Sequence, residues 1–161
     1  STSDVPFPGG VDFSVLYQEK AKAAGIELDV VRESADGYWS NVWLVQPFSL
    51  VAWGARPTPD MILSLAYAGG AAWNETHLDN ARLNEILVEA RAELDDARRG
   101  EMYAEAQMIV SNEGGTIVPF FTNYLFASTP NLVRASEGLS GDWTLDGYRS
   151  AERWWYSADS A

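Results

Sequence analysis

The chain has 161 residues, of which 47% are hydrophobic, so it is long and apolar enough to bury a core as one domain over residues 1–161. Its 23 acidic residues against 11 lysines and arginines give a formal net charge of −12, which repels phosphate backbones and anionic membranes and argues against nucleic acid as a partner. The absence of cysteine excludes disulfides, thiolate metal sites and a cysteine nucleophile.

The N-terminal part of the chain predicts a helix, a strand and a second, short helix. Residues 11–24 carry apolar side chains at helical spacing, and Gly25 follows at a helix C-terminal cap position. Apolar and acidic residues then alternate over 26–30, as in a strand with one buried face. Asp36 is placed to cap a short helix over residues 38–43.

The middle of the chain predicts a buried strand and then a helical hairpin. Residues 48–53 are apolar apart from one serine, which suits a strand covered on both faces. A loop with two prolines leads to a helix that begins near Met61. Apolar residues then recur every three or four positions over Asn80–Leu94 and Asp95–Asn112, which predicts two antiparallel helices.

The adjacent carboxylates Asp95 and Asp96 admit two interpretations. Paired carboxylates can carry out acid–base chemistry. Carboxylates at the start of a helix also cap free backbone N–H groups and complement the helix dipole. We favour capping, because the pair stands where the second helix of the hairpin should begin.

Beyond the hairpin, residues 116–121 and 124–127 each predict a strand. Helices and strands thus follow one another along most of the chain, which is typical of the α/β class. We therefore expect a lobe in which helices flank a mixed β-sheet.

The sequence lacks the usual signatures of catalysis. His77 is the only histidine, no G-x-S-x-G motif surrounds a serine, and neither a G-x-G-x-x-G nor a G-x-x-x-x-G-K-[ST] phosphate loop occurs. We therefore expect that the protein is not an enzyme and uses no cofactor and no metal. A hydrolase acting through Asp or Glu is the weaker alternative, and a structural or protein-interaction domain with an aromatic surface is another.

Tryptophan is the unusual component, with seven in 161 residues. Trp53 precedes Gly54, Trp73 precedes Asn74 and Trp143 follows Asp142, all in or next to stretches predicted as loops. Aromatic side chains beside a few polar groups line small-ligand pockets, and aromatic side chains also anchor cores. For Trp53 the composition leaves these two roles evenly balanced.

Several stretches in order along the chain match the pattern of a known family. They are LYQEKAKAAGIELDVV at 16–31, YW at 38–39 followed by FSLVAWG at 48–54, the helix pair at 84–95 and 98–109, and VPFF at 118–121. In this order and spacing the sequence resembles the C-terminal lobe of periplasmic solute-binding proteins of the peptide/opine/nickel type (family 5). This family includes the dipeptide- and oligopeptide-binding proteins of ABC transporters.

The resemblance implies a function in solute capture. Because family members have two lobes, it implies an excised C-terminal lobe that lacks the N-terminal lobe and the signal peptide. It further implies a monomer in the bacterial periplasm, which captures a peptide-like or other small solute and delivers it to the ABC permease subunits in the membrane.

The matched segments also imply a ligand-binding site, at Tyr38, Trp39, Trp53, Gly54 and Arg56. In peptide-binding members, an aspartate three residues after the equivalent of Trp53 receives the amino group of the ligand, whereas this sequence has Arg56 there. A guanidinium is planar, permanently charged and matched to a carboxylate, so we expect an anionic group on the solute. The alternative is that Arg56 pairs with a neighbouring acid such as Asp60.

Overall fold

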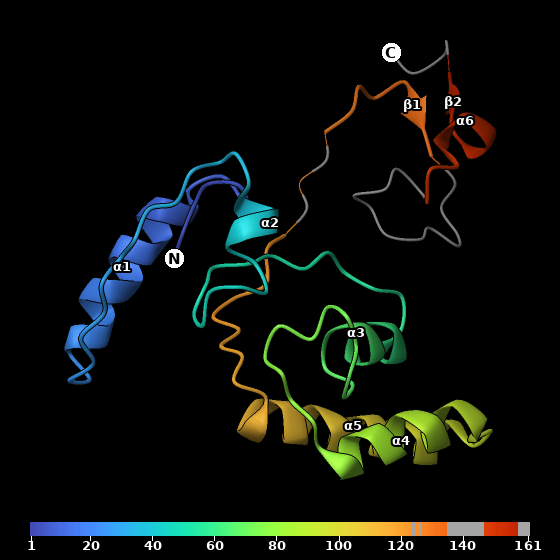
Figure 1. The fold of residues 1–161 in the computed structure, drawn as a ribbon. Coiled ribbons are helices and arrows are strands. Elements are labelled where there is room, and N and C mark those ends of the chain that lie inside the picture. The colour runs from blue at the N-terminus through green and yellow to red at the C-terminus, as the bar shows by residue number, and fades with distance from the viewer. Residues whose placement is uncertain (124, 126, 135–146, 158–161) are drawn as a thin grey trace.

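A computed structural model of the protein describes residues 1–123, 125, 127–134 and 147–157. Over these residues the fold is rich in helix, and its one sheet has two strands. The elements follow in the order α1 (Gly10–Lys22), α2 (Tyr38–Asn41), α3 (Pro59–Ala66), α4 (Ala81–Ala92), α5 (Asp96–Glu113), β1 (Leu132–Val133), α6 (Ser150–Arg153) and β2 (Trp155–Tyr156) (Figure 1). None of the helices in these ranges is long and apolar enough to cross a membrane.

Helices α3, α4 and α5 pack against one another and bury the core (Figure 1). The buried residues of α4 have the spacing that one face of a helix requires: Leu83, Ile86, Leu87 and Ala90. Their partners in the core are Leu63 and Ala66 of α3, Tyr67 directly after α3, and Tyr103 and Ala106 of α5. Burial of this apolar surface is the main favourable term in folding, at about 25 cal/mol per Å².

Both helices of the hairpin begin with a side-chain cap, and the cap of the second helix is the predicted Asp95. The Asn80 side chain accepts a hydrogen bond from the Leu83 N–H at 2.9 Å, and the Asp95 carboxylate accepts one from the Arg98 N–H at 2.9 Å. These contacts occupy backbone donors that have no partner inside the helix. The hairpin is therefore confirmed, as is the capping role of Asp95.

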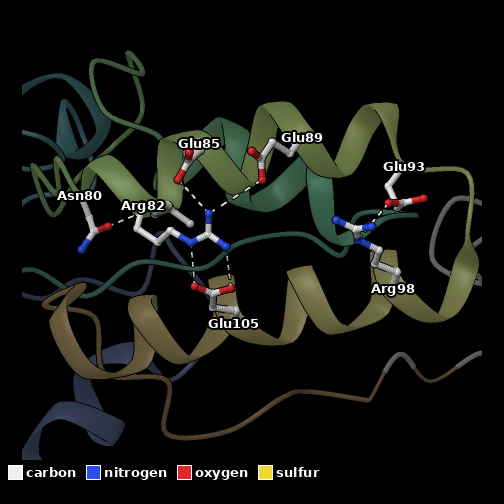
Figure 2. A network of polar contacts seen from close by, with 8 residues as sticks. Asn80, Arg82, Glu85, Glu89, Glu93, Arg98 and Glu105 are labelled. Atoms are coloured by element: carbon white, nitrogen blue, oxygen red, sulfur yellow. Dashed lines mark hydrogen bonds and ion pairs between the residues drawn. The ribbon is translucent and has the colours of Figure 1, made fainter.

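An exposed ion-pair network joins α4 to α5, with Arg82 at its centre (Figure 2). The Arg82 guanidinium donates from Nε and Nη2 to the two carboxylate oxygens of Glu105, at 2.8 and 3.0 Å. Its Nη1 donates to Glu85 on the same helix at 2.7 Å and lies 3.8 Å from Glu89. The hydrogen bonds from Arg82 lower the pKa of Glu105 below its ordinary value of 4.5.

We expect this network to make stability depend on pH. The pKa of Glu105 is lower in the folded protein than in the unfolded chain. The stabilising effect of the Arg82–Glu105 pair is therefore complete above pH 4.5, and it is lost as the pH falls through the lowered pKa of the folded state. At low salt, the urea midpoint of Arg82→Met should therefore fall less steeply on acidification than that of the wild type. Glu101→Gln, at an exposed position on α5, should keep the wild-type slope. Equal slopes for Arg82→Met and wild type would contradict this prediction.

The segment that follows α1 does not form the predicted strand. Residues 26–30 have no regular secondary structure. Pairing begins only at the next residue, where the Thr2 N–H donates to the Val31 carbonyl at 2.8 Å and the Glu33 N–H donates to the Thr2 carbonyl at 2.8 Å. These bonds make a single parallel bridge and not a sheet.

Two further predicted strands are also wrong. Within residues 48–53, the Leu50 N–H donates to the Ser1 carbonyl at 3.0 Å, but no regular ladder of hydrogen bonds forms. Residues 116–121 are irregular, and the Phe120 ring packs edge-on against Phe13 of α1 at a centroid distance of 5.2 Å. These segments are held by side-chain contacts and single backbone bonds.

The only sheet in the described part of the chain lies near its C-terminal end. Strands β1 and β2 pair antiparallel, with Leu132 opposite Tyr156 and Val133 opposite Trp155. Together with α6 they lie away from the α3–α5 core (Figure 1). The strand predicted at 124–127 falls partly outside the described residues, which omit positions 124 and 126.

The predicted lobe with a mixed sheet flanked by helices is therefore not confirmed, and a helix-rich fold is what the described residues show. Apolar alternation identifies a segment that could have two faces. A strand also requires neighbours that take up its backbone N–H and C=O groups. The predicted strands find few such neighbours among the described residues, so they do not assemble.

Candidate functional site

Helix α2 supplies the first aromatic side chains of the site. Its N-cap is Gly37, with a left-handed φ of 80°, in place of the predicted Asp36 cap. Tyr38 is 1% exposed and donates its hydroxyl to the Leu50 carbonyl at 2.7 Å, and burial raises its pKa. Trp39 lies edge-on to the Tyr38 ring at 5.6 Å and is 46% exposed. Tyr38 thus anchors α2, while Trp39 reaches solvent.

Four indole rings gather beside α2, and we call Trp39, Trp43, Trp53 and Trp73 the tryptophan cluster. Trp43 is central, with its ring centroid 5.9 Å from Trp39, 6.4 Å from Trp53 and 5.8 Å from Trp73. The ring centroids of Trp53 and Trp73 lie 6.1 Å apart, so these two rings also contact each other. The pairs are tilted or edge-to-face, the arrangements that aromatic quadrupoles favour.

One carboxylate holds two members of the tryptophan cluster together. The Trp43 Nε1–H donates to Oε2 of Glu75 at 2.6 Å, and the Trp53 Nε1–H donates to Oε1 at 2.9 Å. These bonds are partly buried and involve a charged acceptor, so each is stronger than an ordinary neutral hydrogen bond. Glu75 therefore sets the relative position of two rings that come from different segments.

The loop after Trp53 positions a single cation. Arg56 donates from Nη1 to the Gly54 carbonyl at 2.9 Å and to the Ala55 carbonyl at 3.3 Å. Asp60, the neighbouring acid, instead pairs with Arg91 at 2.9 Å. The structure thus contradicts the alternative in which Arg56 is neutralised by Asp60, and no ion pair to Arg56 forms among the described residues.

These groups border an open hollow of about 200 Å³. Its lining consists of Trp39, Trp43, Val51, Ala52, Trp53, Gly54, Arg56 and Trp73. Four of the five residues predicted to bind a ligand are therefore brought together, and the fifth, Tyr38, is buried against Trp39. A role of these residues in binding stays a prediction.

Sequence reasoning did not select Trp43 or Glu75. It named Trp73 only as a loop tryptophan, together with Trp143, which lies outside the described residues. Trp43 follows Trp39 by four residues, and that spacing places two side chains on one face of a helical turn. Trp73 could be suspected from its loop position but not placed beside Trp53. The sequence has no signal for Glu75, because its role depends on contacts across 32 and 22 residues.

Elsewhere in the part of the chain that the structure describes, no group of His, Cys, Asp and Glu is arranged to hold a metal ion. No protein-family model matches the chain, and no curated protein matches it. A proposal for the function therefore rests on the geometry of the site and on the sequence pattern.

Proposed function

We propose that the chain binds a small solute in the tryptophan-lined hollow and serves as a lobe of the substrate-binding component of an ABC importer. One observation carries the proposal, since four positions selected by the sequence resemblance line the same hollow: Trp39, Trp53, Gly54 and Arg56. Mostly apolar and aromatic walls with a few polar groups are the usual composition of a small-molecule pocket.

The chemistry of the lining supports binding and not catalysis. Indole rings, aliphatic side chains and a guanidinium hold and orient a ligand, and they are not activated nucleophiles. Glu75, the acid that contacts the tryptophan cluster, has each carboxylate oxygen engaged by an indole N–H. This engagement disfavours Glu75 as the base of a hydrolase.

The importer part of the proposal rests on the sequence resemblance. It describes a monomeric periplasmic protein that meets ABC permease subunits at the membrane. Hinged binding proteins close two lobes around a ligand, and the open hollow seen here would supply one wall of such a site.

A protein-interaction surface is the second candidate, and the exposure of two cluster members favours it. Trp39 is 46% exposed and Trp73 is 43% exposed. Exposed tryptophans are enriched in protein–protein contacts as well as in ligand sites. The identity of whatever occupies this surface in the cell distinguishes the two candidates.

Native mass spectrometry of the full-length protein, purified from its host, tests the proposed function. We expect a small molecule bound under gentle conditions and released on unfolding. A protein that co-purifies in place of a small molecule would support the interaction surface. Chemical turnover of the bound compound would contradict the assignment as a binding protein.

We also expect the 161-residue chain alone to bind the solute more weakly than the full-length protein, or not at all. A ligand enclosed by two walls loses its water on both sides, whereas the open hollow leaves one side hydrated. Isothermal titration calorimetry on the two proteins, each shown to unfold cooperatively, measures the difference. Equal affinities would contradict a two-lobed site.

A further inference from the structure

We propose that the solute is a carboxylate with a flat apolar body, most simply an arylacetate, whose carboxylate binds Arg56 and whose ring lies against the tryptophan cluster. This inference deepens the proposed solute-binding function and rests on it. It is carried by the free edge of one guanidinium, by the engagement of the neighbouring acids and by the size of the hollow.

The Arg56 guanidinium is oriented by its own loop and keeps donors for a ligand. Its hydrogen bonds within the described residues leave from Nη1 alone, to the carbonyls of Gly54 and Ala55. The remaining edge has the Nε–H and the two N–H groups of Nη2, a fork that matches the two oxygens of a carboxylate. Because the Nη1 contacts restrain the group, binding costs less conformational freedom.

The acids around the hollow do not neutralise this cation. Asp60 is paired with Arg91 at 2.9 Å and also accepts from Ser64 at 3.1 Å. Glu75 accepts from the indoles of Trp43 and Trp53. Arg56 is therefore the charged side chain in the lining, whereas Glu75 keeps its charge but does not line the hollow. A guanidinium that can contact the ligand favours an anionic group on it.

The rest of the lining selects the body that carries the anion. Cavities of about 150 Å³ hold a benzene molecule, so a hollow of about 200 Å³ has room for one ring and a small substituent. Indole rings inclined at 51° to 86° to one another can offer both faces and edges to a further ring. A flat ring is thus a better fit than a flexible chain.

Two sources present this chemistry: a free arylacetate, and the aromatic C-terminal residue of a short peptide. Both place a carboxylate within one or two bonds of a carbon attached to a ring. Phenylacetate represents the first source and glycyl-phenylalanine the second, so a comparison of their affinities identifies the source.

The experiment is calorimetric titration of the full-length protein with four probes: phenylacetate, glycyl-phenylalanine, phenylacetamide and benzyltrimethylammonium. We expect at least one of the two carboxylates to bind, and the neutral amide and the cation to bind at least tenfold more weakly. Arg56→Ala should weaken carboxylate binding at least tenfold with no change for the amide, and Arg56→Lys should recover part of the loss. Arg32→Ala, an exposed arginine outside this hollow, is the matched control and should bind like the wild type.

Each variant is first shown to have the wild-type unfolding midpoint, so that a loss of binding is not a loss of folding. Equal affinity for phenylacetate and phenylacetamide, or unchanged carboxylate binding in Arg56→Ala, would overturn the inference. A neutral solute found by native mass spectrometry would overturn it while the binding function stands. If no probe binds, the inference is wrong, and if no solute co-purifies either, the proposed function fails with it.

Discussion

Ile86→Ala is expected to lower the free energy of unfolding by about 2–5 kcal/mol. Ile86 lies on α4, is 0% exposed and belongs to the core that α3, α4 and α5 enclose. Alanine removes buried apolar contacts and leaves a cavity that a close-packed interior fills only in part. Because the total stability of a domain is about 5–15 kcal/mol, the loss is a large fraction of it.

Urea unfolding followed by far-UV circular dichroism measures this change, with Val88→Ala as the matched control. Val88 lies two residues away on the same helix and is 67% exposed. Its truncation changes the helix by a similar number of atoms but should alter stability by no more than about 0.5 kcal/mol. Similar losses for the two variants would show that α4 does not present its Ile86 face to a packed core.

The helical hairpin could be predicted from the sequence because each of its signals is local. The spacing of buried residues on α4 and the caps at Asn80 and Asp95 all lie within a few positions of the helix they define. The predicted ends differ from the observed ones by one or two residues, since the first and last residues act as caps or fray.

The strands could not be predicted in the same way, because pairing is not local. Residues 26–30 and 48–53 have the composition of strands, yet what they need is a partner at the right distance and in the right register. Among the described residues, the Leu50 N–H reaches the N-terminal segment through one bond to Ser1, and the two backbone bonds of Thr2 go to Val31 and Glu33, just beyond residues 26–30. The residues that do pair, in β1 and β2, lie beyond the last strand predicted from the sequence, at 124–127.

The candidate site could be predicted only in part, unlike the helical hairpin. The sequence led to Trp39, Trp53 and Arg56 through a resemblance in order and spacing, and the structure brings them to one hollow. It could not choose between pocket and core for Trp53, and the structure shows why. Trp53 packs against the α3–α5 core and lines the hollow at the same time.

This double role links the stability of the helical core to the shape of the site. The ring of Trp53 reaches both, and its Nε1–H is held by Glu75. A change that releases the ring therefore disturbs the hollow without touching the lining directly. Glu75 provides such a change, because it contacts the tryptophan cluster but does not line the hollow.

Glu75→Ala is accordingly expected to destabilise the protein and to loosen the tryptophan cluster. Hydrogen bonds to charged groups contribute about 1.5–3 kcal/mol each, and the partial exposure of this pair reduces that value, so we expect a loss of about 2 kcal/mol for the two together. Glu75→Gln should lose about half as much, because its amide keeps one acceptor oxygen and turns N–H donors toward the second indole. Urea unfolding measures the loss, with the loop variant Glu27→Ala as a control that should match the wild type.

The same variants separate the role of Glu75 in the cluster from a general effect on folding. Coupled indoles give near-ultraviolet circular dichroism that depends on the angles between the rings, so Glu75→Ala should change this signal in folded protein well below the urea midpoint. A double-mutant cycle with Trp43→Phe should show coupling, since Trp43→Phe removes one of the two donors. Additive losses in that cycle, with an unchanged near-ultraviolet spectrum, would mean that the carboxylate does not organise the indoles. Coupled losses would instead show that one half-buried acid holds the rings around the hollow in place.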